Sequence, residues 1–273
     1  MPGTLYLIAT PIGNLEDITL RALRILREVD VIACEDTRQT QKLLHHYGLD
    51  KRTISYHEHN EALRAPELVA QLESGANVAL VSDAGTPLVS DPGYRLVVKA
   101  IERGVQVVPI PGASAVMAAL AASGLPTDTF QFFGFLPARS SQRRKFLAGL
   151  KEASATLIFF EAPHRIRETL ADIAEVLGPR PVVLARELTK IHEQFLRGTA
   201  EELLRSPLPQ KGEFTVLIGK ASSGSREEEM PAAEAVEERV RAGMDRMDAI
   251  KAVAKERGLS KREVYRLTLE KER

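Results

Sequence analysis

The chain of 273 residues is 44% hydrophobic and 27% charged, a composition that is typical of a folded globular protein and excludes a disordered one. Lysine plus arginine and aspartate plus glutamate both number 37, so the net charge is zero, and binding to nucleic acid through bulk positive charge alone is excluded. The single cysteine, Cys34, excludes an intramolecular disulfide framework and a zinc site built from cysteines.

Short apolar strand patterns alternate with helical patterns over the first 124 residues. We predict strands at residues 5–9, 29–34, 78–81 and 105–108, and helices at residues 17–28, 37–47, 62–74, 94–103 and 114–122. The run from Val78 to Val81 is wholly apolar, which is typical of a strand in a sheet that is covered on both faces. Strands that are separated by helices indicate a largely parallel sheet, so residues 1–124 are predicted to be an N-terminal α/β domain.

The alternation breaks at Gly124-Leu125-Pro126-Thr127, and we place a domain boundary there. A second α/β domain, residues 125–221, follows, with strands predicted at residues 130–134, 156–160, 182–185 and 214–218 and helices at residues 142–150 and 165–177. Residues 221–225 are small and polar and are predicted to be a linker. Residues 232–271 carry no strand pattern, so residues 222–273 are predicted to hold the linker and a C-terminal helical module.

Polar, turn-rich segments follow the strands of the first domain, where open parallel sheets bind their ligands. They cover residues 10–14, 35–38, 82–93 and 109–114. The segment from Ser82 to Gly93 contains two aspartates and two prolines, which predicts a rigid loop whose backbone groups can hold a small polar molecule. The alternative is a structural turn in which Asp91 caps the next helix. A Walker phosphate loop and the dinucleotide glycine fingerprint are both absent from the sequence.

Ionisable residues follow two predicted strands of the second domain, at residues 161–165 and 186–190. His164 can take up a proton near neutral pH, although a histidine at the surface near a helix start is equally common. A cluster of solvated ion pairs is the alternative reading for residues 186–190.

The neutral total charge conceals a polarised tail. Residues 239–266 contain nine basic and four acidic residues, whereas residues 226–238 contain one arginine and six glutamates. Ser260 followed by Glu263 forms a capping box, so a short helix, a turn at Gly258 and a second helix are predicted, which is a helix-turn-helix pattern. A nucleic-acid-binding arm is one interpretation, and a solvated helical hairpin is the other.

Eight sequence blocks occur in the order that is typical of one known superfamily. They are ATPIGN at residues 9–14, EDTR at 35–38, SDAGTPLVSDPG at 82–93, PIPGASAV at 109–116, FGFLP at 133–137, FFEAPHR at 159–165, ARELTK at 185–190 and GEFTVLIG at 212–219. With these blocks the chain resembles the tetrapyrrole methylase superfamily and, within it, the family of small-subunit ribosomal RNA 2′-O-ribose methyltransferases I. The resemblance covers about residues 4–220, and the helical tail is similar to the C-terminal module of that family.

The resemblance implies that S-adenosylmethionine binds in a cleft between the two α/β domains. The positions that it implies for binding the cofactor are Pro11, Ser82, Asp83, Ala84, Gly85, Thr86, Leu88, Val89, Ala113, Ser114 and Ala115. It also implies methylation of the ribose 2′-oxygen of a cytidine in the decoding region of 16S ribosomal RNA, within the small ribosomal subunit, by a homodimer. We expect a cytoplasmic protein without a membrane partner, because no apolar run approaches the roughly 18 residues that span a bilayer.

Methyl transfer to a ribose hydroxyl needs no metal, but it benefits from a group that removes the hydroxyl proton. Our candidates for that group are Glu161, His164 and Glu187. Basic residues that could hold RNA are Arg38, Arg165, Arg186, Lys190, Lys261 and Arg262, and a further basic stretch beside the cleft comprises Arg139, Arg143, Arg144 and Lys145. The nucleotide to be modified must be unstacked to enter a cleft.

Three other functions remain open from the sequence. A tetrapyrrole C-methyltransferase would need neither the helical tail nor the arginine-rich second domain. A non-catalytic RNA-binding or ribosome-assembly factor would not need the ionisable strand ends. A nucleotide-dependent phosphoryl transferase could use Asp83 and Asp91 for magnesium but lacks a phosphate loop.

Overall fold

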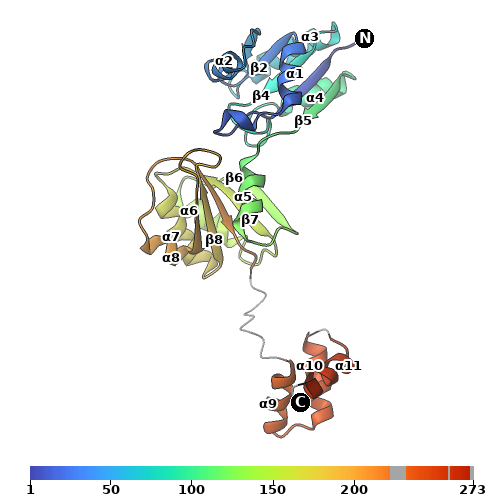
Figure 1. Cartoon of the computed structure of the whole chain (residues 1–273), viewed down its shortest axis with the longest axis vertical. Helices are drawn as coiled ribbons and strands as arrows, with labels where there is room; N and C mark the ends of the chain where they lie inside the picture. The colour runs from blue at the N-terminus through green and yellow to red at the C-terminus, as the bar shows by residue number, and fades with distance from the viewer. Residues whose placement is uncertain (222–231, 258, 271–273) are drawn as a thin grey trace. The chain divides into compact units, whose positions relative to one another are not determined.

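The computed structural model describes residues 1–221, 232–257 and 259–270. The chain divides into two compact units, residues 1–221 and residues 222–273, which are described separately (Figure 1). Residues 222–225 of the predicted linker, residues 226–231 of the acidic stretch and Gly258 of the predicted turn lie outside the described residues. No described helix is both long enough and apolar enough to cross a membrane.

The first sheet of the larger unit is fully parallel, as the alternation of strands and helices predicts. Its strands are β1 (Thr4–Ile8), β2 (Val31–Cys34), β3 (Thr53–Ser55), β4 (Val78–Val81) and β5 (Gln106–Ile110), in the order β3-β2-β4-β1-β5. The edge strand β3 is absent from the sequence prediction, because three residues are too few to show a period. The strand order places the loops after β1, β4 and β5 at one edge of the sheet.

Helices cover both faces of this sheet. On one face, α1 (Leu20–Glu28) and α2 (Thr37–His46) pack on side chains such as Ile8 and Ile32, and on the other face α3 (Glu61–Glu73) and α4 (Tyr94–Glu102) pack on Leu5 and Leu80. The predicted helix at residues 17–28 begins only at Leu20, because Thr19 caps it by accepting a hydrogen bond from the Ala22 N–H. A short 3₁₀ turn, η1 (Leu15–Asp17), precedes it.

The second sheet is mixed. Its strands are β6 (Phe130–Phe135), β7 (Thr156–Glu161), β8 (Pro181–Arg186), β9 (Gln194–Thr199) and β10 (Phe214–Ile218), in the order β6-β7-β10-β8-β9. Only β6 and β7 pair in parallel, and the other neighbours are antiparallel. The sequence does not predict β9, because none of its residues is buried and Gly198 interrupts it, so it lacks the apolar run of a covered strand.

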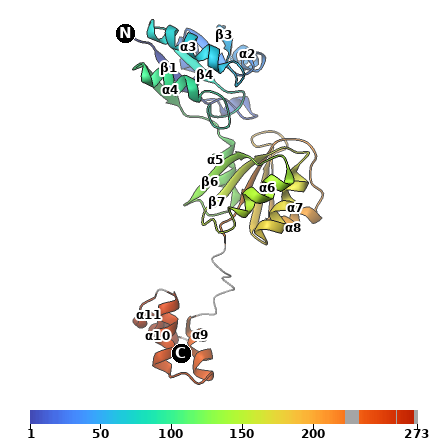
Figure 2. The ribbon, with the colours of Figure 1, turned by 180° about the vertical axis from the view of Figure 1, so that it is seen from behind.

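The faces of the second sheet are covered unequally. On one face lie α6 (Ser140–Ala148), α7 (Ile166–Leu177) and α8 (Ala200–Arg205), and on the other lies α5 (Ala115–Ser123), which both views place beside this sheet (Figures 1 and 2). Val116 and Leu120 of α5 pack against Val183 and Leu217. Thus α5 packs on the second sheet although it precedes residue 124, and the domain boundary that we place after that residue stays a prediction.

The smaller unit is helical, as predicted. It contains α9 (Ala232–Arg241), α10 (Arg246–Arg257) and α11 (Lys261–Glu270), which share a core that includes Val236, Ile250 and Val264. The capping box is confirmed: Glu263 N–H donates to Ser260 Oγ over 3.2 Å, and Ser260 N–H donates to Glu263 Oε2 over 2.9 Å.

Candidate functional site

Two cavities share a wall at the carboxyl ends of β1 and β4. The first has a volume of about 430 Å³ and is lined by the loops that follow β1 and β4, by the start of α5, and by strands and loops of the second sheet. The second has a volume of about 540 Å³ and lies between the loop after β1 and the start of α2. The shared wall consists of Ile12, Asp83, Ala84 and Glu213. A cavity of either size can enclose most of a small organic ligand.

The loop from Ser82 to Gly93 is built as a ligand-facing surface. Thr10 and Gly85 exchange two backbone hydrogen bonds of 2.9 and 3.0 Å, which ties this loop to the loop after β1, and Gly85 adopts the φ of +86° that this close approach requires. Leu88 and Ser90 also have positive φ, a strained conformation that clusters at functional sites. Asp91 does not cap α4, because Gly93 occupies the N-cap position, so the structural-turn alternative is wrong in that respect.

Carboxylates gather on the first-sheet side of the first cavity. Burial, followed by the negative charge of Glu35, raises the pKa of Asp91 to about 6. Burial and the neighbouring Asp83 likewise raise the pKa of Glu35. Asp83 itself accepts the Asp36 N–H over 3.0 Å through Oδ1. Among the described residues, no group of three or more His, Cys, Asp or Glu side chains is arranged to hold a metal ion.

The N-terminus of α5 forms another part of the first cavity. Ser114 is its N-cap and accepts a hydrogen bond from the Met117 N–H, and the Thr86 hydroxyl donates to the Ala113 carbonyl. Ser114, Ala115 and Val116 line the cavity. The first N–H groups of a helix carry partial positive charge, so this end favours a carboxylate.

Most of the predicted cofactor-binding residues meet at the first cavity. Those that line it are Asp83, Ala84, Gly85, Thr86, Val89, Ser114 and Ala115. Pro11 and Ser82 line the second cavity, and Leu88 and Ala113 line neither. The resemblance also implies contacts from strand ends of the second domain, but the sequence prediction names no cofactor-binding residue there; the wall that the second sheet and its loops provide comprises Phe135, Phe160, Ala162, Pro163, Ala185, Leu188, Phe214 and Thr215. These residues lie inside the sequence blocks that carry the resemblance, which is the signal that could have found them.

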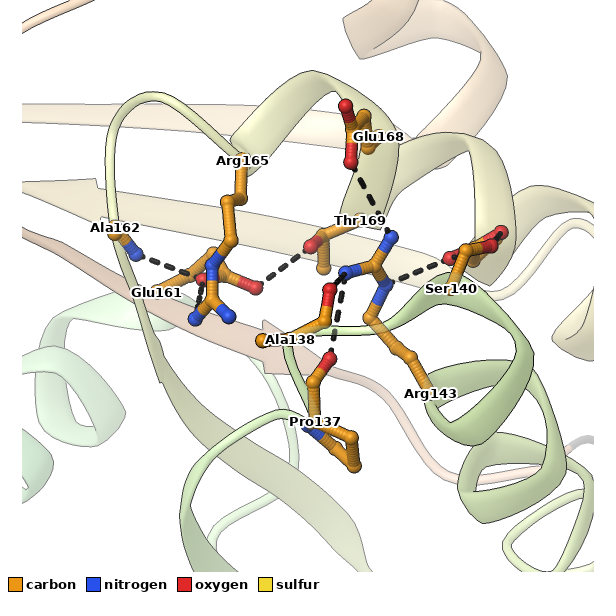
Figure 3. Close-up of polar contacts among 10 residues, drawn as sticks. Pro137, Ala138, Ser140, Arg143, Glu161, Ala162, Arg165, Glu168 and Thr169 are labelled. Atoms are coloured by element: carbon orange, nitrogen blue, oxygen red, sulfur yellow. Dashed lines mark hydrogen bonds and ion pairs between the residues drawn. The ribbon is translucent and has the colours of Figure 1, made fainter.

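Glu161 lines the first cavity, but both of its carboxylate oxygens are engaged (Figure 3). Oε1 pairs with Arg165 at 2.5 Å and accepts the Ala162 N–H at 2.8 Å, while Oε2 accepts the Thr169 hydroxyl at 2.6 Å. The Glu161 side chain is fully buried. This geometry favours a structural role for Glu161 and for Arg165, and their roles in proton transfer and RNA binding stay predictions.

Glu187 belongs to a bridge across the loops of the second sheet. Lys190 Nζ lies 3.0 Å from Glu187 Oε1 and 2.9 Å from Glu213 Oε2. Burial raises the pKa of Glu187, but the hydrogen bonds from Lys190 and from the Glu213 N–H outweigh it and hold the pKa below its usual range. The Lys190 side chain covers Gly13, where an added Cβ would lie 2.8 Å from Lys190 Cε. The bridge therefore joins loops of both sheets.

The remaining predicted residues are more exposed. His164 is exposed and lines neither cavity. Arg38 is exposed and pairs with Asp36, and Arg186 Nε donates to the Lys211 carbonyl over 2.8 Å. Lys261 and Arg262 are exposed in the first turn of α11. Their predicted contacts with RNA stay predictions.

Arg143, which the sequence analysis places in a basic stretch beside the cleft, is not available to bind RNA. Its side chain is fully buried and pairs with Asp172 at 2.6 Å, and it also donates to the carbonyls of Pro137 and Ala138 (Figure 3). A guanidinium that is withdrawn from solvent cannot hold an RNA phosphate. Arg143 instead anchors α6 to α7 beneath the chain that follows β6, whereas Arg144 beside it is exposed.

Known proteins resemble this chain in sequence and in fold. Residues 4–204 match the tetrapyrrole (corrin/porphyrin) methylases. A ribosomal RNA small subunit methyltransferase I from Halalkalibacterium halodurans is 50% identical over 97% of this chain and 94% of its own length, and one from Synechocystis sp. is 46% identical over 99% of each. Among solved structures, diphthine synthase matches with a TM-score of 0.61 at 18% identity, over 80% of this chain and 90% of that chain. Uroporphyrin-III C-methyltransferase from Thermus thermophilus matches with a TM-score of 0.56 at 22% identity, over 80% of this chain and 95% of that chain.

Proposed function

Because the chain belongs to the tetrapyrrole methylase family and to its ribosomal RNA small subunit methyltransferase I branch, we propose that it methylates 16S ribosomal RNA at the 2′-oxygen of a cytidine ribose in the decoding region. The chain is an S-adenosylmethionine-dependent RNA methyltransferase. The observation that carries the proposal is near-complete coverage of relatives of that name at about half identity.

The first cavity fits S-adenosylmethionine. Its carboxylates, Asp83 and Asp91, suit a ligand with positive charge, and the N-terminus of α5 suits the ligand's carboxylate. Phe160, Leu188 and Phe214 provide apolar walls for a purine. When bound, S-adenosylmethionine supplies a methyl group on a positively charged sulfur, which is an electrophile towards oxygen.

The residues of this chain hold and orient the two reactants. The hydrogen bonds between Thr10 and Gly85 fix the loop that lines the cavity, and the bridge from Lys190 to Glu187 and Glu213 fixes the opposite loop. Such fixing matters because the reacting atoms must approach to about 3 Å in line.

The partners extend this proposal. The substrate is the small ribosomal subunit, the enzyme acts in the cytoplasm as a homodimer, and flanking phosphates contact Arg38, Arg186 and Lys190. Arg38 lies in the first turn of α2, Arg186 is the last residue of β8, and Lys190 lies on the loop that follows β8.

Transfer of a tritiated methyl group tests the function. The purified chain is given labelled S-adenosylmethionine with unmodified small ribosomal subunits, naked 16S RNA or a porphyrinogen. We expect label in RNA and an adjacent phosphodiester that resists alkali, because a methylated 2′-oxygen cannot attack the phosphate. Label in the porphyrinogen alone would support the tetrapyrrole alternative, and no label in any acceptor would overturn the enzyme assignment.

A further inference from the structure

The second cavity has no assigned ligand, yet it opens beside the first. Its lining is mixed: Leu15 and Leu43 are apolar, whereas Thr40, Gln39 and Lys42 are polar or charged. Gln39 and Lys42 lie on α2 with exposed side chains, and Lys42 Nζ donates to Gln39 Oε1 over 3.1 Å. A volume of about 540 Å³ accommodates one nucleotide.

The wall between the two cavities contains two carboxylates. Glu213 is held by Lys190, as described above. Asp83 lies in the same wall, and in the described parts of the chain its side chain takes part in a single hydrogen bond, in which Oδ1 accepts the Asp36 N–H. No described cation lies within ion-pairing distance of Asp83, so its second oxygen can accept a proton from a ligand in either cavity.

We propose that the second cavity receives the acceptor nucleotide and that Asp83 removes the proton from its ribose hydroxyl. This inference rests on the proposed function. The O–H bond breaks as the new O–CH₃ bond forms, the proton passes to the Asp83 carboxylate, and the electron pair of the donor's S–CH₃ bond stays on sulfur. Lys42 then contacts the phosphate and Gln39 the base or ribose of one unstacked nucleotide.

The position of Asp83 suits a proton acceptor better than the positions of the three residues that the sequence analysis proposed. Glu161 has both oxygens engaged, Glu187 is held by Lys190, and His164 lines neither cavity. Asp83 alone among the described carboxylates of the shared wall has no ion-pair partner. A proton acceptor must lie within hydrogen-bond reach of the acceptor hydroxyl and leave the line from its oxygen to the methyl carbon open, and Asp83 borders the cavity of each reactant.

A cysteine footprint tests the binding site without relying on turnover. The native Cys34 is fully buried, so Gln39→Cys adds one accessible thiol in the second cavity. Gln41→Cys is the matched control, because Gln41 is exposed on the same helix but bonds Thr53 and lines neither cavity. With S-adenosylhomocysteine present, we expect unmodified small subunits to slow alkylation of Gln39→Cys by about tenfold and that of Gln41→Cys by less than about twofold. Equal protection of both thiols, or protection of neither, would overturn the proposal that the acceptor nucleotide binds in the second cavity.

Substitution of Asp83 tests the proton step. Asp83→Asn keeps an oxygen that can accept the Asp36 N–H, and we expect kcat at saturating S-adenosylmethionine to fall by about 100-fold or more while KM for small subunits changes by less than about threefold. Asp50→Asn, at an exposed site before β3, is the control that keeps kcat. A kcat for Asp83→Asn within about threefold of the wild type would overturn the role of Asp83. If the wild-type chain labels no RNA, the proposed function fails instead, so the two failures are distinguishable.

Discussion

The hydroxyl of Thr169 donates a 2.6 Å hydrogen bond to Oε2 of Glu161, an oxygen that a proton acceptor would need to keep free (Figure 3). Oε1 of the same carboxylate is held by Arg165 and by the Ala162 N–H. The contacts tie the end of β7 to the first turns of α7. A carboxylate at the cavity wall is thus used to fix the backbone that forms the wall.

Glu161→Gln is therefore expected to reduce stability more than turnover. The substitution leaves the Arg165 guanidinium, which is 17% exposed, without its counter-ion, and we expect a loss of about 3 kcal/mol in the free energy of unfolding, measured by urea denaturation. Glu201→Gln, which alters an exposed pair at 3.9 Å, should change it by less than about 1 kcal/mol. A 100-fold loss of kcat with unchanged stability would instead restore Glu161 as the proton acceptor.

Two adjacent arginines on α6 should respond differently to the same change. Arg143→Gln leaves Asp172 buried without a cation, and we expect it to lower the free energy of unfolding by about 3–5 kcal/mol. Arg144→Gln removes an exposed ion pair with Glu175 and should cost less than about 1 kcal/mol. Thermal unfolding of the two variants under one set of conditions provides the comparison, and equal losses would contradict the difference in burial.

These two arginines also show how far the sequence could be interpreted. The run Val78 to Val81 predicted β4 with its observed bounds, because a strand that is covered on both faces must be apolar throughout. A charged run such as residues 143–145 does not reveal which guanidinium is buried, since that depends on Asp172, which lies on another helix. Likewise, Asp83 could be placed in a ligand loop, but its position between two cavities depends on residues that are distant in sequence and line the same cavities, such as Ile12 and Glu213.

The Asp91 carboxyl should make the free energy of unfolding decrease as the pH is raised on the acid side of neutrality. The ordinary pKa of its carboxyl is 3.8, and burial together with Glu35 raises the pKa to about 6 in the folded protein. Between these values the folded chain binds more protons than the unfolded chain, so raising the pH lowers the free energy of unfolding across that window. Asp91→Asn removes this contribution. We expect the stability difference, wild type minus Asp91→Asn, to fall from pH 3.8 to about 6 and to level off above; a difference that rises with pH would contradict the burial of Asp91.

Gly13 and Lys190 should behave as a coupled pair. Gly13→Ala places a methyl group against the Lys190 side chain, so the lysine must shift, and we expect the shift to weaken its bridge to Glu187 and Glu213. We expect Gly13→Ala to weaken binding of S-adenosylmethionine, measured by calorimetry, by about tenfold, and Gly13→Ala combined with Lys190→Ala to be no weaker than Lys190→Ala alone. Additive losses would show that the two residues act independently.

The tail should contribute salt-dependent affinity for RNA and nothing to the cofactor site. Among the described residues, those that line the two cavities belong to the larger unit, and Lys261 and Arg262 are exposed on α11. If each contacts a phosphate of unpaired RNA, replacing both by glutamine removes about 1.4 from the slope of log affinity against log salt concentration. Arg241→Gln, at an exposed position of α9 that pairs loosely with Glu237, is the control and should leave the slope unchanged.

Filter binding to small subunits at several salt concentrations measures the slope, and calorimetry measures the affinity for S-adenosylmethionine, which should not change. An equal loss of RNA and cofactor affinity would mean that the tail supports the fold of the larger unit, and an unchanged slope would favour the solvated helical hairpin.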